Sequence, residues 1–182
     1  MLLRAAGVPI DVCPADLDER RLQSNVTAQS PDAIALHLAC EKAAAVARSH
    51  GGRLVLGADQ VLAVEGRCFS KPADRSAARD QLRQLSGQTH ELHSAIAFAQ
   101  DGTVLFEHVS MARLTMRAFS EEFLDLYLDA IGDAATGSVG GYQLEDCGIQ
   151  LFDRIEGDYF TVLGLPLLAA LNFLRQRGCL AQ

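Results

Sequence analysis

The apolar residues of this 182-residue chain follow two periods, one typical of helices and one typical of strands. Apolar positions recur every three or four residues in four stretches, which predicts amphipathic helices. Each stretch follows a Ser, Asp or Pro, which are residues typical of helix N-termini. The predicted helices cover residues 31–49, 75–85, 121–131 and 167–177.

β-forming residues dominate much of the chain between these helices. Asp101-Gly102 lies between two such segments and is a strong signal for a two-residue hairpin. The predicted strands cover residues 8–14, 54–58, 61–64, 89–99, 103–117 and 149–155. The order of these elements predicts an α/β protein with a partly antiparallel sheet. No repeat or linker divides the chain, so we expect a single domain over residues 1–182.

The composition is globular, with 49% hydrophobic and 21% charged residues, and the formal net charge is −7. This acidic balance argues against broad binding to nucleic acid or to an anionic membrane. No apolar run approaches the roughly 20 residues of a membrane span. The five cysteines form no zinc-ligand pattern and indicate reduced, mostly buried thiols in a cytoplasmic protein.

Positive charge is distributed unevenly, because 14 of the 16 cations are Arg and only Lys42 and Lys71 are Lys. A Lys retained in such a chain can mark a site that needs a compact ammonium rather than a planar guanidinium. Lys71 precedes Pro72, so its backbone is held extended and its side chain is suited to a phosphate contact. Either Lys could instead be an ordinary solvated side chain, and Lys42 could extend along its helix to water.

Three acidic positions are candidates for chemistry. Asp59 comes directly after the apolar strand 54–58, where a carboxylate can hold Mg²⁺, accept a proton from water, or only cap a turn. Glu19, beside Asp18, is a metal ligand or a solvated charge. Glu145 follows the tandem glycines of GGYQLE, which indicate close backbone approach. The chain has no dinucleotide-binding fingerprint, P-loop or GxSxG motif, which excludes those three classes of site.

The ordered set of these segments resembles the Maf family of nucleotide pyrophosphatases. The matching pieces are ADLDE (15–19), LACEKA (38–43), VLGADQVL (55–62), SKPAD (70–74), LSG (85–87), GGYQLE (140–145) and IEGDYFTVLGLPL (155–167). The resemblance implies a single elongated domain around a mixed sheet, related to the inosine triphosphate pyrophosphatases. It also implies hydrolysis of a nucleoside triphosphate to the monophosphate and pyrophosphate with Mg²⁺ or Mn²⁺, by a cytoplasmic homodimer.

The resemblance gives roles to individual residues. Asp59 takes the place of the proton acceptor and metal ligand, and Glu19 that of a second acidic residue near the metal. Lys42 and Lys71 take the places of the lysines that contact phosphate. Gln60 and Glu145 stand where the substrate is selected and resemble the branch of the family that acts on 7-methyl-GTP.

The beginning of the chain departs from the family pattern. Residues 2–7, LLRAAG, have the pattern of the second half of a helix that stops at Gly7. Family members carry a strand and a Ser-x-x-Arg-Arg loop before this helix, so we expect that these elements are missing here. That expectation keeps an alternative open, a non-catalytic nucleotide-binding regulator of cell division and septum formation.

Overall fold

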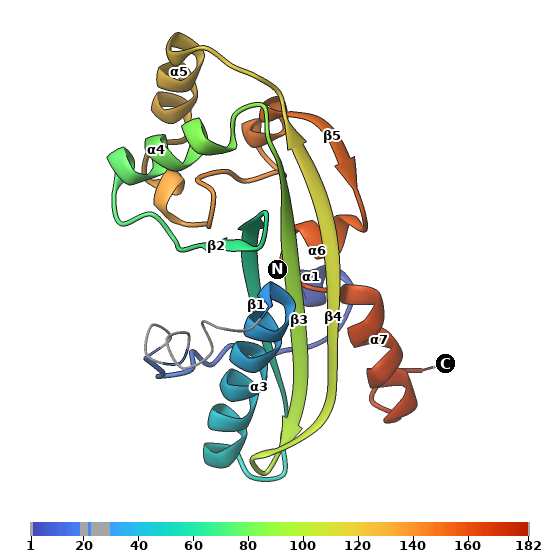
Figure 1. Ribbon diagram of the computed structural model, residues 1–182. Coiled ribbons are helices and arrows are strands. Elements are labelled where there is room, and N and C mark those ends of the chain that lie inside the picture. The colour runs from blue at the N-terminus through green and yellow to red at the C-terminus, as the bar shows by residue number, and fades with distance from the viewer. Residues whose placement is uncertain (1, 19–21, 23–29, 182) are drawn as a thin grey trace. The chain divides into compact units, whose positions relative to one another are not determined.

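A computed structural model describes residues 2–18, 22 and 30–181 and contains a five-stranded sheet in the order β2-β1-β3-β4-β5 (Figure 1). The combination of helices with a sheet confirms the predicted α/β class. Neighbouring strands of the sheet run antiparallel in the described part of the chain. The strands are β1 (Leu54–Val64), β2 (Arg67–Phe69), β3 (Thr89–Gln100), β4 (Thr103–Met116) and β5 (Phe152–Glu156). The α-helices are α1 (Leu2–Ala5), α3 (Pro31–Ser49), α4 (Arg75–Leu85), α5 (Glu121–Ile131), α6 (Tyr159–Val162) and α7 (Leu167–Gln176).

Local signals account for the elements that were predicted correctly. The Asp74 side chain accepts a hydrogen bond from Ala77 N at the start of α4, and Ser120 caps α5 in the same way. Asp101 and Gly102 have φ values of 52° and 82°, the left-handed conformation that a tight turn between β3 and β4 requires. Capping and turn chemistry therefore fixed these boundaries.

Two predicted strands were wrong, one entirely and one in part. Residues 8–14 have no regular structure, because Pro9 and Pro14 lack the N–H groups that a strand ladder needs. The first three residues of the predicted strand 149–155 belong to the 3₁₀ helix Cys147–Leu151, and β5 starts only at Phe152. The cysteines also differ from the prediction, since two are exposed and three are half-buried.

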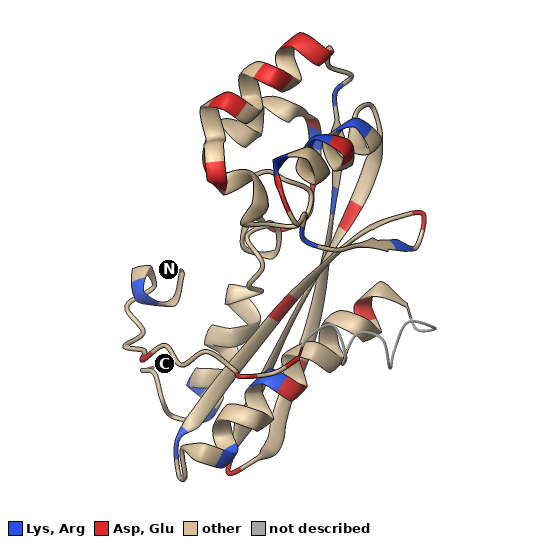
Figure 2. Ribbon diagram, turned by 90° about the vertical axis from the view of Figure 1, so that its left-hand side faces the viewer, with Lys and Arg blue, Asp and Glu red and all other residues tan. Residues whose placement is uncertain are grey.

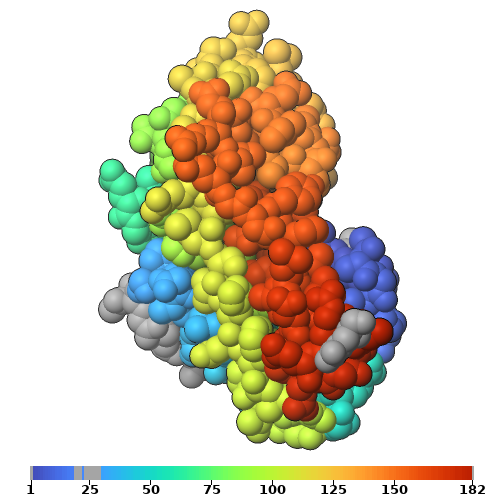
Figure 3. All heavy atoms as spheres, turned by 90° about the vertical axis from the view of Figure 1, so that its right-hand side faces the viewer, coloured from blue at the N-terminus to red at the C-terminus, as the bar shows by residue number. Residues whose placement is uncertain are grey.

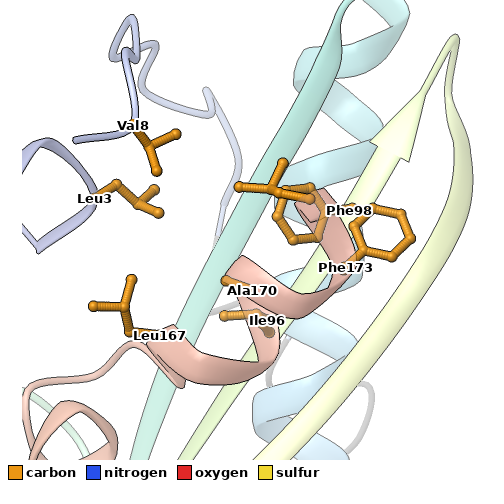
Figure 4. Packing of buried hydrophobic residues seen from close by; sticks show 8 residues of the cluster. Leu3, Val8, Ile96, Phe98, Leu167, Ala170 and Phe173 are labelled. Carbon is orange, nitrogen blue, oxygen red and sulfur yellow. The ribbon is translucent and has the colours of Figure 1, made fainter. Parts of the chain in front are cut away.

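The chain forms two compact units, the first of residues 1–60, 93–111 and 158–182, the second of residues 61–92 and 112–157. The core of the first unit joins the N-terminal segment, β3 and α7. The Phe173 ring lies with its centroid 4.7 Å from those of both Phe98 and Phe106. Figure 4 shows Leu3 and Leu167 beside this cluster. In Figure 3 the C-terminal residues, in red, lie between the N-terminal segment and β4.

In the second unit, ion pairs connect α4 to α5. The acidic residues of α5, visible as red bands in Figure 2, bind arginines of α4. Glu121 accepts hydrogen bonds from Arg79 and Arg83, and this lowers its pKa to about 2. Among the described residues, no helix is both long and apolar enough to span a membrane.

Candidate functional site

The candidate site in the first unit is built on close contact between α3 and β1. Gly57 lies on β1, and a Cβ there would lie only 2.6 Å from Ala43 N and would also strike the Ala39 carbonyl oxygen. The glycine therefore lets the strand contact the backbone of α3 directly. Because strand side chains alternate, Gly57 and Asp59 share the face toward α3.

This contact brings Lys42 and Asp59 together. The Lys42 ammonium donates a hydrogen bond to Asp59 Oδ1 at 2.6 Å, and the two side chains are 20% and 11% exposed. An ion pair this strongly shielded interacts more strongly than one on the surface. The structure thus joins two of the predicted site residues, which lie 17 positions apart in the sequence.

The side chain of Gln60 lies on the opposite face of β1 from that of Asp59, because successive side chains of a strand alternate between its two faces. Its Nε2 donates to Ser94 Oγ at 2.8 Å and to the carbonyl oxygens of Thr161 and Val162, both at 3.1 Å. Gln60 therefore connects β1 to α6 on the face away from α3.

Lys71 and Glu145 belong to the second unit, where each lies on an exposed segment. Lys71 follows β2, and the Gln81 side chain braces its loop by donating to the Ser70 carbonyl oxygen at 2.7 Å. Glu145 lies in a turn after the buried Tyr142. Glu19 is outside the described residues, so its expected place beside a metal stays a prediction.

A divalent cation is compatible with the residues present. Within residues 2–18, 22 and 30–181, no three His, Cys, Asp or Glu side chains form a metal-binding group. Mg²⁺ does not require such a group, because it keeps several waters and is held by one or two carboxylates plus substrate phosphates. Asp59 is a carboxylate of this kind, at 11% exposure.

A thiol nucleophile does not fit the site. Cys40 lies two residues before Lys42 on α3, and its Sγ is 3.6 Å from a carboxylate oxygen of Glu107. Burial and this negative charge raise the pKa of the thiol to about 11. The reactive thiolate is therefore scarce at neutral pH.

Three further residues that lie at the site were not predicted from the sequence. Gly57 had a signal, since a glycine inside an apolar strand indicates close backbone approach. Ser94 and Thr161 are buried polar residues whose partners come from distant segments, and neither has a local pattern that marks it.

Comparison with known proteins gives the family of the chain. The sequence pattern of the Maf-like proteins matches residues 1–177. The chain belongs to the Maf family. A "nucleoside triphosphate pyrophosphatase" from Rhodopseudomonas palustris strain HaA2 is 56% identical over 180 residues, which are 99% of this chain and 89% of the relative.

Two further relatives extend the comparison within the Maf family. A protein from Bradyrhizobium diazoefficiens with the same name is 56% identical over 181 residues, 100% of this chain and 90% of the relative. A "7-methyl-GTP pyrophosphatase" from Brucella abortus is 44% identical over 181 residues, 98% of this chain and 91% of the relative.

Proposed function

We propose that this Maf-family chain hydrolyses nucleoside triphosphates to the monophosphate and pyrophosphate. The observation that carries the proposal is the shielded pair of Lys42 Nζ and Asp59 Oδ1, 2.6 Å apart between α3 and β1. A cation beside a carboxylate provides a phosphate contact and a proton acceptor in one place. The curated names of relatives at 52–56% identity support this reaction class.

The reaction needs no covalent intermediate. A water oxygen forms a bond to the α-phosphorus, and the bond from that phosphorus to the bridging oxygen of pyrophosphate breaks. Asp59 accepts the proton of the attacking water, and Lys42 and Lys71 stabilise the charge that develops on the phosphate oxygens. Positioning and electrostatics account for most of the catalysis in reactions of this kind.

Asp59 and Glu19 are the proposed ligands of Mg²⁺ or Mn²⁺. When bound, such a cation neutralises charge on the triphosphate and polarises its phosphoryl oxygens. The triphosphate itself would provide further ligands.

We further propose that the substrate is a modified or non-canonical nucleotide, with 7-methyl-GTP preferred. The Glu145 carboxylate can accept hydrogen bonds from the N1–H and N2–H₂ groups of guanine, and methylation at N7 adds positive charge that favours a carboxylate. Gln60 is the second position proposed to bear on substrate choice. The name of the Brucella abortus relative supports this preference. A cytoplasmic homodimer is the proposed working form.

The test is pyrophosphate release from a panel of 7-methyl-GTP, GTP, ITP, dTTP and UTP with Mg²⁺ or Mn²⁺. The matches cover 89–91% of the length of these relatives. The assay therefore also includes a chimeric protein, in which the residues of a relative that lie outside the match are joined to this chain. Release from at least one nucleotide is expected, and its absence from both versions would favour a non-catalytic regulator. A preference for dTTP over 7-methyl-GTP would refute the proposed substrate.

Asp59→Asn tests the proton acceptor in the same assay. The substitution should lower kcat by about 100-fold or more while nucleotide binding persists. Asp11→Asn is the matched control, because Asp11 is 77% exposed and pairs with Arg53. Unchanged turnover in Asp59→Asn would remove Asp59 from its proposed role.

A further inference from the structure

The Gln81 side chain uses both ends of its amide in hydrogen bonds to two different loops of the second unit. Its Nε2 donates to the Ser70 carbonyl oxygen at 2.7 Å, and its Oε1 accepts from Gly140 N at 3.1 Å. A carbonyl oxygen only accepts and a backbone N–H only donates, so these partners fix the orientation of the amide. Figure 1 shows the segment after α5, in orange, beside the helix α4 that carries Gln81.

The two loops carry two of the proposed substrate contacts. Ser70 directly precedes Lys71, which is the proposed phosphate contact. Gly140 begins the GGYQLE segment, which ends at Glu145, the proposed base contact. Opposite ends of one nucleotide would make these contacts, so their separation must match the length of that nucleotide. Such geometry is critical, because a misplacement of about 1 Å can cost about 100-fold in rate.

The backbone of the Lys71 loop has fixed points on both sides of the lysine. On one side, Gln81 binds the Ser70 carbonyl oxygen. On the other side, Pro72 is buried and Asp74 caps the start of α4. The exposed Lys71 side chain therefore extends from a short segment whose position depends on the Gln81 hydrogen bond.

The glycine segment is packed too closely to be anchored by a side chain of its own at position 140. Gly140 has φ of 84°, and a Cβ there would lie 2.8 Å from Leu62 Cδ1 and from the Tyr142 ring. Ser138 Oγ closes the turn by donating to the Tyr142 carbonyl oxygen at 2.6 Å. The bond from Gly140 N to Gln81 then attaches this closed turn to α4.

We propose that Gln81 is a positioning residue, whose amide fixes Lys71 and Glu145 relative to each other and so couples phosphate binding to base selection. This inference rests on the proposed pyrophosphatase function and on the roles proposed there for these two residues. Gln81 itself does not contact the nucleotide, because the protein occupies both ends of its amide. Replacing Gln81 should therefore weaken base selection only as long as Glu145 is present.

Gln81→Met tests the proposal because it keeps the side-chain length and removes both hydrogen-bonding groups. We expect the ratio of kcat/KM for 7-methyl-GTP to that for UTP to fall by about fivefold or more, the size of effect that residues of one network show. We also expect KM for both nucleotides to rise by about two- to fivefold, because Lys71 is displaced as well.

The same substitution in a Glu145→Gln background separates positioning from a general loss of structure. If Gln81 acts on base selection through Glu145, Gln81→Met should change the nucleotide ratio by less than about twofold once Glu145 is replaced. An equal change with and without Glu145 would overturn the proposal.

Gln84→Met is the matched control, because Gln84 is an exposed glutamine of the same helix. This variant should keep the wild-type KM and nucleotide ratio. A purely structural role of Gln81 would lower the melting temperature of Gln81→Met and leave the nucleotide ratio unchanged, which would refute positioning.

Amide hydrogen exchange provides a readout that does not depend on turnover. Peptides covering residues 69–73 and 138–142 should both exchange faster in Gln81→Met than in the wild type and in Gln84→Met. Gln81→Glu keeps an oxygen for Gly140 N and loses the donor to Ser70, so only the first peptide should exchange faster. Equal exchange in all these proteins would overturn the proposal. A wild-type chain without activity or without base preference would instead refute the proposed function, and exchange would still decide whether Gln81 joins the two loops.

Discussion

Lowering the pH from 7 to 4.5 should destabilise the second unit through His90, a fully buried residue of β3. Its Nε2 lies 2.7 Å from the Tyr142 hydroxyl, and its Nδ1 is buried without a hydrogen-bond partner. The aromatic rings of Tyr142 and Phe152 have centroids 5.6 Å and 5.9 Å from that of His90. These surroundings provide no negative charge for an imidazolium, and burial lowers the pKa of His90 to about 4.

The sign and size of the effect follow from linkage. A pKa that is lower in the folded protein means that the unfolded chain binds the proton first, so stability is lost as the pH falls. The contribution of His90 is complete above the ordinary histidine pKa of 6.5 and declines as the pH falls toward the folded-state pKa of about 4. Between pH 7 and pH 4.5 this one group should lower the free energy of unfolding by about 2 kcal/mol.

His90→Phe removes the titrating group while it keeps an aromatic ring in the cluster. At pH 7 its stability should be close to that of the wild type. The substitution loses the hydrogen bond to the Tyr142 hydroxyl, and this cost is offset because it also removes the buried Nδ1 that has no hydrogen-bond partner. At pH 4.5 the variant should be more stable than the wild type by about 2 kcal/mol.

Urea unfolding at pH 7 and pH 4.5 measures both values. Phe152→Leu is the control, since it changes the same cluster without changing a titrating group, and it should destabilise equally at both pH values. An equal loss of stability on acidification in the wild type and in His90→Phe would refute the reasoning.

Three further substitutions have definite expected outcomes. Gly57→Ala should destabilise by about 3 kcal/mol or more in urea unfolding, because its Cβ would overlap the backbone of α3, whereas Gly51→Ala has space and should cost far less. Glu121→Gln should lower the melting temperature at pH 7 and have much less effect near pH 2, where about half of the wild-type carboxylate is protonated. Lys42→Arg should lower kcat/KM by about tenfold, because a planar guanidinium cannot reproduce a compact contact of 2.6 Å to Asp59; wild-type kinetics would show that charge alone suffices.

Elements with strong local signals were predictable from the sequence. The capping residues Asp74 and Ser120 began helices as expected, and Asp101-Gly102 formed the hairpin turn. The prediction failed where two signals competed. Alternating Val, Ile and Val at 8–12 favour a strand, but the adjacent prolines remove the hydrogen bonds that a strand requires.

The candidate site was predictable only as a set of separate residues. Composition identified Lys42 as one of two lysines, and the end of an apolar run identified Asp59. Their pairing depends on how closely α3 approaches β1, which Gly57 controls and which no spacing within either element reveals. Prediction also treated residues 54–58 and 61–64 as two strands, because Asp59 and Gln60 interrupt the apolar pattern.

The polar residues Asp59 and Gln60 interrupt the apolar pattern of β1 for a physical reason, although the strand itself is continuous. A strand covered on both faces normally carries apolar residues at every position, and a polar pair within it must find partners on both faces. Asp59 finds Lys42 on α3, and Gln60 finds Ser94 and α6 on the opposite face. The side chain that is proposed to bear on substrate choice therefore also joins β1 to two backbone carbonyl oxygens of α6.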